Sequence, residues 1–190
     1  MAKSRFSDAR GFSLIEVMVA TGLLTTALVA LAQLLAMSVT ANTAAKNTTF
    51  ATVLAEQKLE QLRALTWGFD ENGLPLSDST TDTAVDPEDP NSGTGLSPSP
   101  AAALQEDTPG YVDYVDRWGK IVGKDADDAP DGAIYFRRWS VEPLPTNPNN
   151  TLIIQVLVGP IRPRGANDEG AVARMSEEAR VITVKTRKAQ

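Results

Sequence analysis

An apolar run from residue 12 to residue 39 dominates the amino-terminal part of the chain. It is broken mainly by Glu16, Gln33 and small hydroxyl residues, and the chain has no second run of this kind. As a helix rising about 1.5 Å per residue, the run would reach roughly 40 Å, which is enough to cross a bilayer core of about 30 Å. The run therefore predicts one membrane-spanning helix in contact with the lipid bilayer.

Helical character continues beyond this run. No proline or glycine occurs from Thr40 to Thr66, and residues 51–64 consist mostly of good helix formers. We expect one helix from Phe12 to about Thr66 that ends at Trp67-Gly68, where the glycine would serve as its C-cap. An apolar stripe on one side of the predicted helix consists of Ala51, Leu54, Ala55, Leu62 and Leu65.

Charged residues accompany this stripe. Lys58 falls inside it and weakens the pattern, whereas Glu60 and Arg63 are spaced to pair along the helix. The following segment, from Asp70 to Pro109, is rich in Asp, Ser, Thr, Pro and Gly. Within it, Thr81 to Pro100 is typical of a long solvated loop.

The remainder of the chain has a strand-like pattern. Tyr111–Val115 and Lys120–Val122 flank a turn at Arg117-Trp118-Gly119 and could form a hairpin. In Ile134–Val141, Tyr135, Trp139 and Val141 share a face, while Phe136 and Arg137 break the alternation. The further predicted strands are Leu152–Val158 and Arg180–Arg187. Strands without intervening helices favour an antiparallel sheet, so the expected fold class is α+β, with a long amino-terminal helix packed on that sheet.

Composition excludes several kinds of function. The 190 residues include no cysteine and no histidine, which removes disulfides, thiolate zinc sites, cysteine nucleophiles and the commonest general base. No catalytic constellation emerges, so neither an enzyme nor a cofactor is expected. The first eleven residues carry a formal charge of +2 and the rest −8, within a net charge of −6. An acidic body argues against nucleic acid as a partner.

Glu16 needs a partner if it lies inside a membrane. A carboxylate at mid-membrane costs about 2.5–3.5 kcal/mol on insertion scales. A cut between Gly11 and Phe12 would free an amino group on Phe12. That amine could pair with the carboxylate of Glu16 between neighbouring subunits inside an apolar bundle, which would give Glu16 a role in assembly.

The segment Arg10-Gly11-Phe12-Ser13-Leu14-Ile15-Glu16-Val17 resembles the amino-terminal processing motif of type IV pilins and type II secretion pseudopilins. The resemblance implies that a prepilin peptidase cuts after Gly11 and methylates Phe12, and that Glu16 is the family's glutamate for subunit assembly. It also implies other pilins or pseudopilins and an inner-membrane assembly platform as partners. The implied location is the inner membrane, with the amino terminus cytoplasmic and the carboxy-terminal domain periplasmic, and afterwards a pilus or pseudopilus fibre.

The expected organisation follows from these features. It comprises a cleaved leader at 1–11, the membrane-spanning half of the helix at 12–39, its soluble half at 40–68, an acidic flexible loop region at 69–110 and the antiparallel sheet domain at 111–190.

Placement within the family rests on weaker features. Major pilins usually carry a carboxy-terminal disulfide loop, which this cysteine-free chain cannot form. The stretch Leu54–Arg63 resembles the region after the span in minor pilins of the pilus modification type, and also in the minor pseudopilin I family. We therefore expect a minor pilin that enters or primes a type IV pilus, with a type II secretion minor pseudopilin as the alternative.

Two further readings of the amino terminus remain open. A membrane-anchored periplasmic binding module that never polymerises would need the same apolar run. An ordinary secretory signal would fit Ala30-Leu31-Ala32, but the run continues past Ala32, and Glu16 stands early in its core.

Other clusters have simpler explanations than a site. Asp125, Asp127, Asp128 and Asp131 are weak calcium candidates without EF-hand spacing, as are Asp86, Glu88 and Asp89, and solvated acidic loops are expected instead. The aromatic residues of the strand region are expected mostly to pack the sheet against the helix, although they could line a binding surface. These are Tyr111, Tyr114, Trp118, Tyr135 and Trp139. Scattered surface positions are expected for Arg162, Arg164 and Arg174, rather than a basic patch.

The proposed cut is directly testable by mass spectrometry of the protein purified from its host membranes. We expect a mature chain that begins with N-methylated Phe12, because the basic leader and the Gly11-Phe12 bond match the processing motif. A different first residue would contradict the prediction, and an unmethylated Phe12 would restrict it to cleavage alone.

Overall fold

The computed structural model describes residues 11–82, 93–124, 129–161 and 178–188. It separates into two compact units, Met1–Thr43 and Ala44–Gln190. The one long helix within these described ranges, α1, runs from Leu14 to Ala64 and contributes to both units. The predicted helix is thus confirmed. It begins two residues after the expected Phe12 and ends two residues before the expected Thr66.

Ser13 determines where α1 begins. Its Oγ accepts a hydrogen bond from the Ile15 N–H at 3.3 Å, and its carbonyl accepts bonds from the N–H groups of Glu16 and Val17. A serine in this position satisfies amide groups that the first helical turn leaves without partners. The backbone of Phe12 therefore lies outside the helix.

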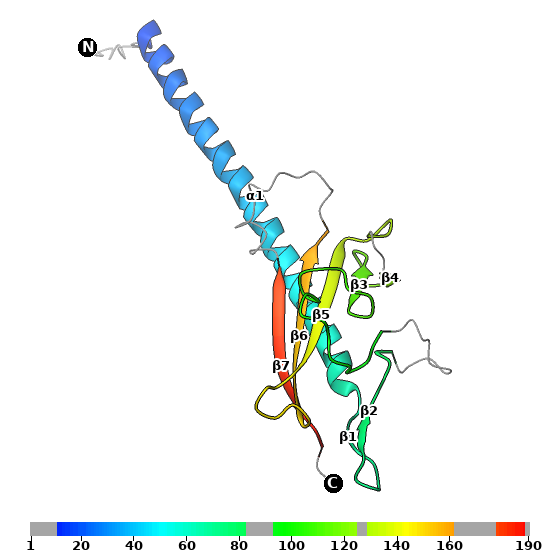
Figure 1. Ribbon diagram of the computed structural model, residues 1–190. Helices are drawn as coiled ribbons and strands as arrows, with labels where there is room; N and C mark the ends of the chain where they lie inside the picture. Colours follow the sequence, from blue (N-terminus) through cyan, green and yellow to red (C-terminus); the bar gives the residue numbers. More distant parts are fainter. Residues whose placement is uncertain (1–10, 83–92, 125–128, 162–177, 189–190) are drawn as a thin grey trace, which may run out of the picture. The chain divides into compact units, whose positions relative to one another are not determined.

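Among the described residues, seven strands follow the helix (Figure 1). β3, β4, β5, β6 and β7 form one antiparallel sheet in the order β4-β3-β5-β6-β7, while β1 and β2 form a separate hairpin. All five predicted strand regions lie in the larger sheet, so the α+β expectation is confirmed. The strand bounds are β1 Trp67–Phe69, β2 Pro75–Ser77, β3 Val112–Val115, β4 Ile121–Lys124, β5 Tyr135–Pro143, β6 Thr151–Pro160 and β7 Ala179–Thr186.

The core of the larger unit lies between the last four turns of α1 and one face of the sheet. The predicted helix stripe is buried there against apolar side chains of β5 and β6, including Trp139, Val141 and Ile154. Burial of each such side chain contributes about 1.5–3 kcal/mol. Hydrophobic burial therefore holds the soluble part of the helix on the sheet.

Two local expectations about the region after the helix were wrong. Gly68 is not the helix C-cap, because α1 ends at Ala64 and Gly68 is a residue of β1. The hairpin β1–β2 was not predicted, although its turn has a recognisable signal: Asp70 Oδ1 accepts the N–H groups of Asn72 and Leu74, and Gly73 has φ of +77°. Strands of three residues are too short to produce a clear alternation.

The acidic segment is also more ordered against the sheet than its composition suggests. Residues 83–92 lie outside the described residues, but Thr81, Leu96 and Ala103 on either side are buried. The N–H of Ser99 donates to the carbonyl of Val141 in β5 at 2.9 Å. A few small or apolar anchors and backbone hydrogen bonds are enough to hold a segment that is poor in large side chains.

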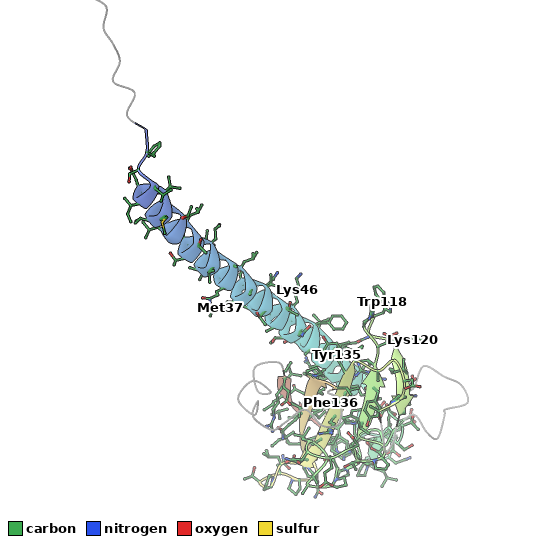
Figure 2. The ribbon with its side chains drawn as sticks, turned by 90° about the horizontal axis from the view of Figure 1, so that it is seen from above. Met37, Lys46, Trp118, Lys120, Tyr135 and Phe136 are labelled. Carbon is green, nitrogen blue, oxygen red and sulfur yellow. The ribbon has the colours of Figure 1, made fainter. Side chains whose placement is uncertain are left out.

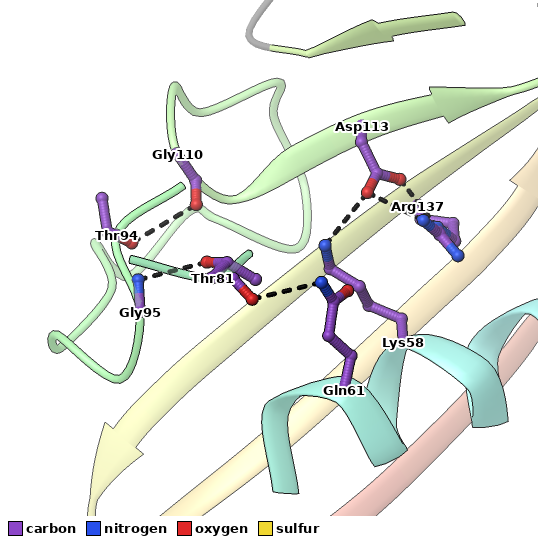
Figure 3. A network of polar contacts seen from close by, with 8 residues as sticks. All are labelled: Lys58, Gln61, Thr81, Thr94, Gly95, Gly110, Asp113 and Arg137. Atoms are coloured by element: carbon purple, nitrogen blue, oxygen red, sulfur yellow. Dashed lines mark hydrogen bonds and ion pairs between the residues drawn. The ribbon is translucent and has the colours of Figure 1, made fainter. Parts of the chain in front are cut away.

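A buried ion cluster joins the helix to the sheet (Figure 3). Lys58 Nζ of α1 lies 3.0 Å from Asp113 Oδ2 of β3, and Arg137 of β5 donates to both oxygens of Asp113 at 2.7 and 2.9 Å. The three side chains are at most 4% exposed. Lys58 Nζ also lies 3.8 Å from the centre of the Trp139 ring. The expected break in alternation at Arg137 was therefore wrong, because Arg137 shares the buried face with Tyr135, Trp139 and Val141.

The electrostatics of the cluster favour its charged form. Burial alone would raise the pKa of Asp113, but Lys58 and Arg137 outweigh it and hold that pKa below its ordinary value of 3.8. Burial lowers the pKa of Lys58, and the carboxylate of Asp113 opposes that shift. Each charge is therefore tolerated in the core only because the others are present.

Replacement of Asp113 by Asn should lower the free energy of unfolding by about 3–5 kcal/mol, because Lys58 and Arg137 would remain buried without a counter-charge. Urea unfolding followed by tryptophan fluorescence measures this, since Trp139 lies beside Lys58. The matched control is Glu60→Gln, which removes the exposed pair with Arg63 and should cost about 0.5 kcal/mol or less.

The native protein and the Asp113→Asn variant also allow a test by pH. The contribution of ionised Asp113 is fully present above its ordinary pKa of 3.8 and is lost as the pH falls through its lower folded-state pKa. The difference between the native chain and Asp113→Asn should therefore be constant above about pH 4 and shrink below it. A difference that does not change with acidification would contradict this assignment.

Candidate functional site

The candidate processing bond joins Gly11 to Phe12, immediately before α1. Both residues lie outside regular secondary structure and are exposed, with Phe12 83% exposed. A side-chain carbon built on Gly11 would meet no described atom within 4 Å. The structure therefore leaves this bond open to an enzyme, while residues 1–10 of the leader lie outside the described residues.

Glu16 lies in the first turn of α1, four residues after Phe12. The N-terminus of a helix carries a partial positive charge, so a carboxylate in this turn is favourable. Within the part of the chain that the structure describes, no residue pairs with the carboxylate of Glu16. Glu16 is therefore available to a cation that the described residues do not supply.

The helical residues around Glu16 are apolar and exposed on every side. From residue 14 to residue 43 no side chain is buried. Hydroxyl groups in this stretch bond back to the helix itself, as in Thr21 to the Val17 carbonyl at 2.9 Å and Thr25 to the Thr21 carbonyl at 2.7 Å. These bonds satisfy the hydroxyls inside the helix and reduce the cost of placing them in an apolar medium.

The length and composition of α1 allow it to cross a membrane. Among the described residues, α1 is the one helix that is long and apolar enough for this. Its most apolar 18-residue window has a mean hydropathy of 2.1, and none of that window is buried. An exposed apolar surface of this size needs lipid or other protein around it. The helix and the accessible Gly11-Phe12 bond together form the candidate site.

The other candidate residues do not gather into a site. Asp131 is exposed, whereas Asp125, Asp127 and Asp128 lie outside the described residues, as do Asp86, Glu88 and Asp89. No group of three or more carboxylates that could hold a metal ion occurs among the residues that are described. Arg162, Arg164 and Arg174 also lie outside them.

The aromatic residues divide into two groups. Tyr111, Tyr135 and Trp139 belong to the core between α1 and the sheet, as expected, and Tyr114 is buried outside that core, but Trp118 is 83% exposed. The sequence pattern alone did not separate Trp118 from the others. The signal was its place in a turn before a glycine, where the chain reverses direction and the side chain has no neighbouring strand on which to pack.

A chain shortened to begin at Ala44 should stay in solution without detergent, because the exposed apolar helix is removed and the larger unit keeps its own core. The full chain should sediment with membranes and resist carbonate extraction. Ultracentrifugation measures both outcomes, and circular dichroism of the aromatic side chains checks that the shortened chain remains folded. A full chain that stays soluble without lipid or detergent would contradict the interpretation of α1.

Comparison with known proteins agrees with this geometry. Residues 6–32 match the prokaryotic N-terminal methylation motif, a stretch that contains Gly11, Phe12, Glu16 and much of the exposed apolar helix. No curated protein and no solved structure matches the chain. Proteins with this motif are structural rather than catalytic, and an apolar amino-terminal helix together with the motif fits a single-pass protein anchored in the inner membrane. The chain therefore carries the amino-terminal signal of type IV pilins and pseudopilins, followed by an α+β fold.

Proposed function

We propose that this protein is a minor pilin-like structural subunit that assembles into, or primes, a type IV pilus. In this proposal prepilin peptidase cuts between Gly11 and Phe12 and methylates Phe12. The observation that carries the proposal is Glu16, a carboxylate without a described partner on an exposed apolar helix, four residues after an accessible Gly11-Phe12 bond.

Cleavage gives Glu16 its partner. The new amino group on Phe12 carries a positive charge, and the apolar helices of adjacent subunits exclude water around it. A charge pair in such surroundings is far stronger than in water, and the alternative is an unpaired carboxylate in an apolar medium. The pair forms between neighbouring helices, so it sets the register with which one subunit follows another.

The membrane stage precedes assembly. The basic leader stays on the cytoplasmic side, following the preference of Lys and Arg for that side of the membrane, and the sheet unit lies in the periplasm. An inner-membrane assembly platform then transfers the helix from lipid to the bundle. The transfer exchanges one apolar environment for another, so apolar contact alone does not fix how the helix sits in the bundle. The charge pair supplies the specificity of that placement.

The absence of cysteine from the whole chain supports a minor subunit, since the usual disulfide loop of a major pilin cannot form. The type II secretion pseudopilin alternative shares the same processing chemistry. Recovery of the protein from sheared surface fibres favours the pilus. Retention in the periplasm with a loss of secretion would assign the subunit to the secretion system.

Replacement of Glu16 by Ala should abolish incorporation into sheared fibres or reduce it by about tenfold or more, because the charge pair that sets the register is lost. Immunoblotting of the fibre and membrane fractions measures the change. Glu56→Ala is the matched control, since Glu56 is an exposed glutamate on the same helix beyond the apolar run.

The membrane level of the Glu16→Ala variant, and its cleavage after Gly11, should match the native protein. Unchanged incorporation of this variant would contradict the assembly role and favour a non-polymerising anchor.

A further inference from the structure

Gln33 is the one amide side chain in the apolar run from residue 12 to residue 39. It is exposed, and its amide makes no hydrogen bond to any described residue. The threonines of the run differ, because the hydroxyls of Thr21, Thr25 and Thr26 bond to carbonyls of the preceding turn. A glutamine amide has two N–H donors and an oxygen acceptor, so Gln33 presents polar groups that a second molecule can bond.

The depth of Gln33 makes its amide acceptable in a bilayer but costly in a helix bundle. Gln33 lies 21 residues after Phe12, or about 30 Å along the helix, so the amide of a membrane-embedded chain reaches the headgroups of the far side. Leu31, Leu34 and Leu35 around it are apolar and exposed. When neighbouring helices cover these leucines, the headgroups are lost and an unpaired amide becomes unfavourable. Assembly therefore requires a polar partner for Gln33 on another helix.

Ser38 is a second polar residue of this part of α1. It is exposed and makes no hydrogen bond to the residues that the structure describes. The adjacent Met37 is 69% exposed and projects away from α1 (Figure 2). Ser38 follows Glu16 by 22 residues, which is about six turns, so the two side chains lie within about 40° of the same side of the helix. A parallel helix that brings a cation to Glu16 therefore also passes Ser38.

The charge pair proposed above determines which residues of two neighbouring helices lie level. If the Phe12 amine of one copy meets Glu16 of the next, the helices are offset by the axial distance between these groups. That distance is about 6 Å if the whole segment is helical and about 10 Å if the two residues before α1 are extended, which corresponds to about four to seven helical residues. Gln33 then lies level with residues 37–40 of the next copy.

Two of these four residues are polar, and they differ in what their hydroxyls do. The Thr40 hydroxyl donates to the Ala36 carbonyl of its own helix at 2.6 Å. The Ser38 hydroxyl has no such bond among the described residues. Ser38 is therefore the partner that the offset brings to Gln33.

We propose that the Gln33 amide of one copy donates a hydrogen bond to the Ser38 hydroxyl of the next copy in the bundle. The proposal rests on the assembly function proposed above. It names a second copy as the neighbour, because the spacing of Gln33 and Ser38 matches the offset that Phe12 and Glu16 of the same chain require. Gln33 lies about 100° around the helix from Glu16, so each copy uses Gln33 towards one neighbour and Ser38 towards another. A contact between two different surfaces extends into a helical array.

Disulfide cross-linking of the full chain in membranes and sheared fibres tests this contact, since the native chain has no cysteine. The variant Gln33→Cys/Ser38→Cys should give linked dimers and a longer ladder in fibres on mild oxidation. Its two cysteines cannot link within one chain, because five residues along a helix separate their Cα atoms by more than the roughly 7 Å that a disulfide spans.

The matched control is Gln33→Cys/Thr40→Cys, since Thr40 is exposed at a similar height but lies about 160° around the helix from Ser38. It should give at least about tenfold less product, because the thiols lie outside disulfide reach. Equal linkage in the control, linkage only to a protein of another mass, or a double-cysteine variant that enters fibres without linkage would overturn the contact and leave the assembly function intact. Absence of the native protein from fibres would instead contradict assembly, and linkage in membranes would then still support the contact.

Incorporation into fibres gives an independent measurement, with membrane levels compared by immunoblotting. Ser38→Ala should lower recovery in fibres by about fivefold, because the Gln33 amide of the adjoining copy is left buried and unpaired. The further change Gln33→Leu should restore recovery to near the native level, because neither polar group then remains. Native recovery of Ser38→Ala, or no restoration by the second change, would contradict the contact.

Discussion

The buried cluster of Lys58, Asp113 and Arg137 is the interaction on which the arrangement of the larger unit depends. It joins α1, β3 and β5, and its charges are tolerated in the core only when all three elements are in place. A shift of the helix by one turn would move Lys58 away from Asp113, which would keep only Arg137, and would bury the ammonium group without a counter-ion. Apolar side chains would permit several neighbouring registers, so the cluster specifies the one that is observed.

The fixed register of the helix on the sheet matters because one helix has two different surroundings. Up to residue 43 its surface is apolar and exposed on every side, while from Ala51 to Leu62 a single stripe is buried against the sheet. Both halves are rich in Leu and Ala, but the first is apolar on every side and the second only along this stripe. The difference lies in the charged residues, because the second half carries Lys58, whose only acceptable place in the core is beside Asp113.

The same distinction explains what could be predicted from the sequence. The helix, the five strand regions of the larger sheet and the segment around Gly11, Phe12 and Glu16 follow from local periodicity and a short motif. The cluster joins residues 55 and 24 positions apart, so no local pattern contains it. Arg137 had a signal, because its spacing from Tyr135 and Trp139 places it on the buried face, but the burial of an arginine is improbable until its carboxylate is known.

Asp113 and Glu16 are both carboxylates in apolar surroundings, and each needs a cation to offset the cost of its charge. They differ in where that cation comes from. Asp113 has two cations within its own chain, so its charge stabilises the folded unit. Glu16 has no partner among the described residues and lies on a surface that only lipid or another protein can cover. A charge of this kind is costly in a solitary chain, and a second molecule that brings a cation removes the cost. In the assembly proposed above, the physics that fixes the register of the helix inside the unit would therefore also favour a defined register between subunits.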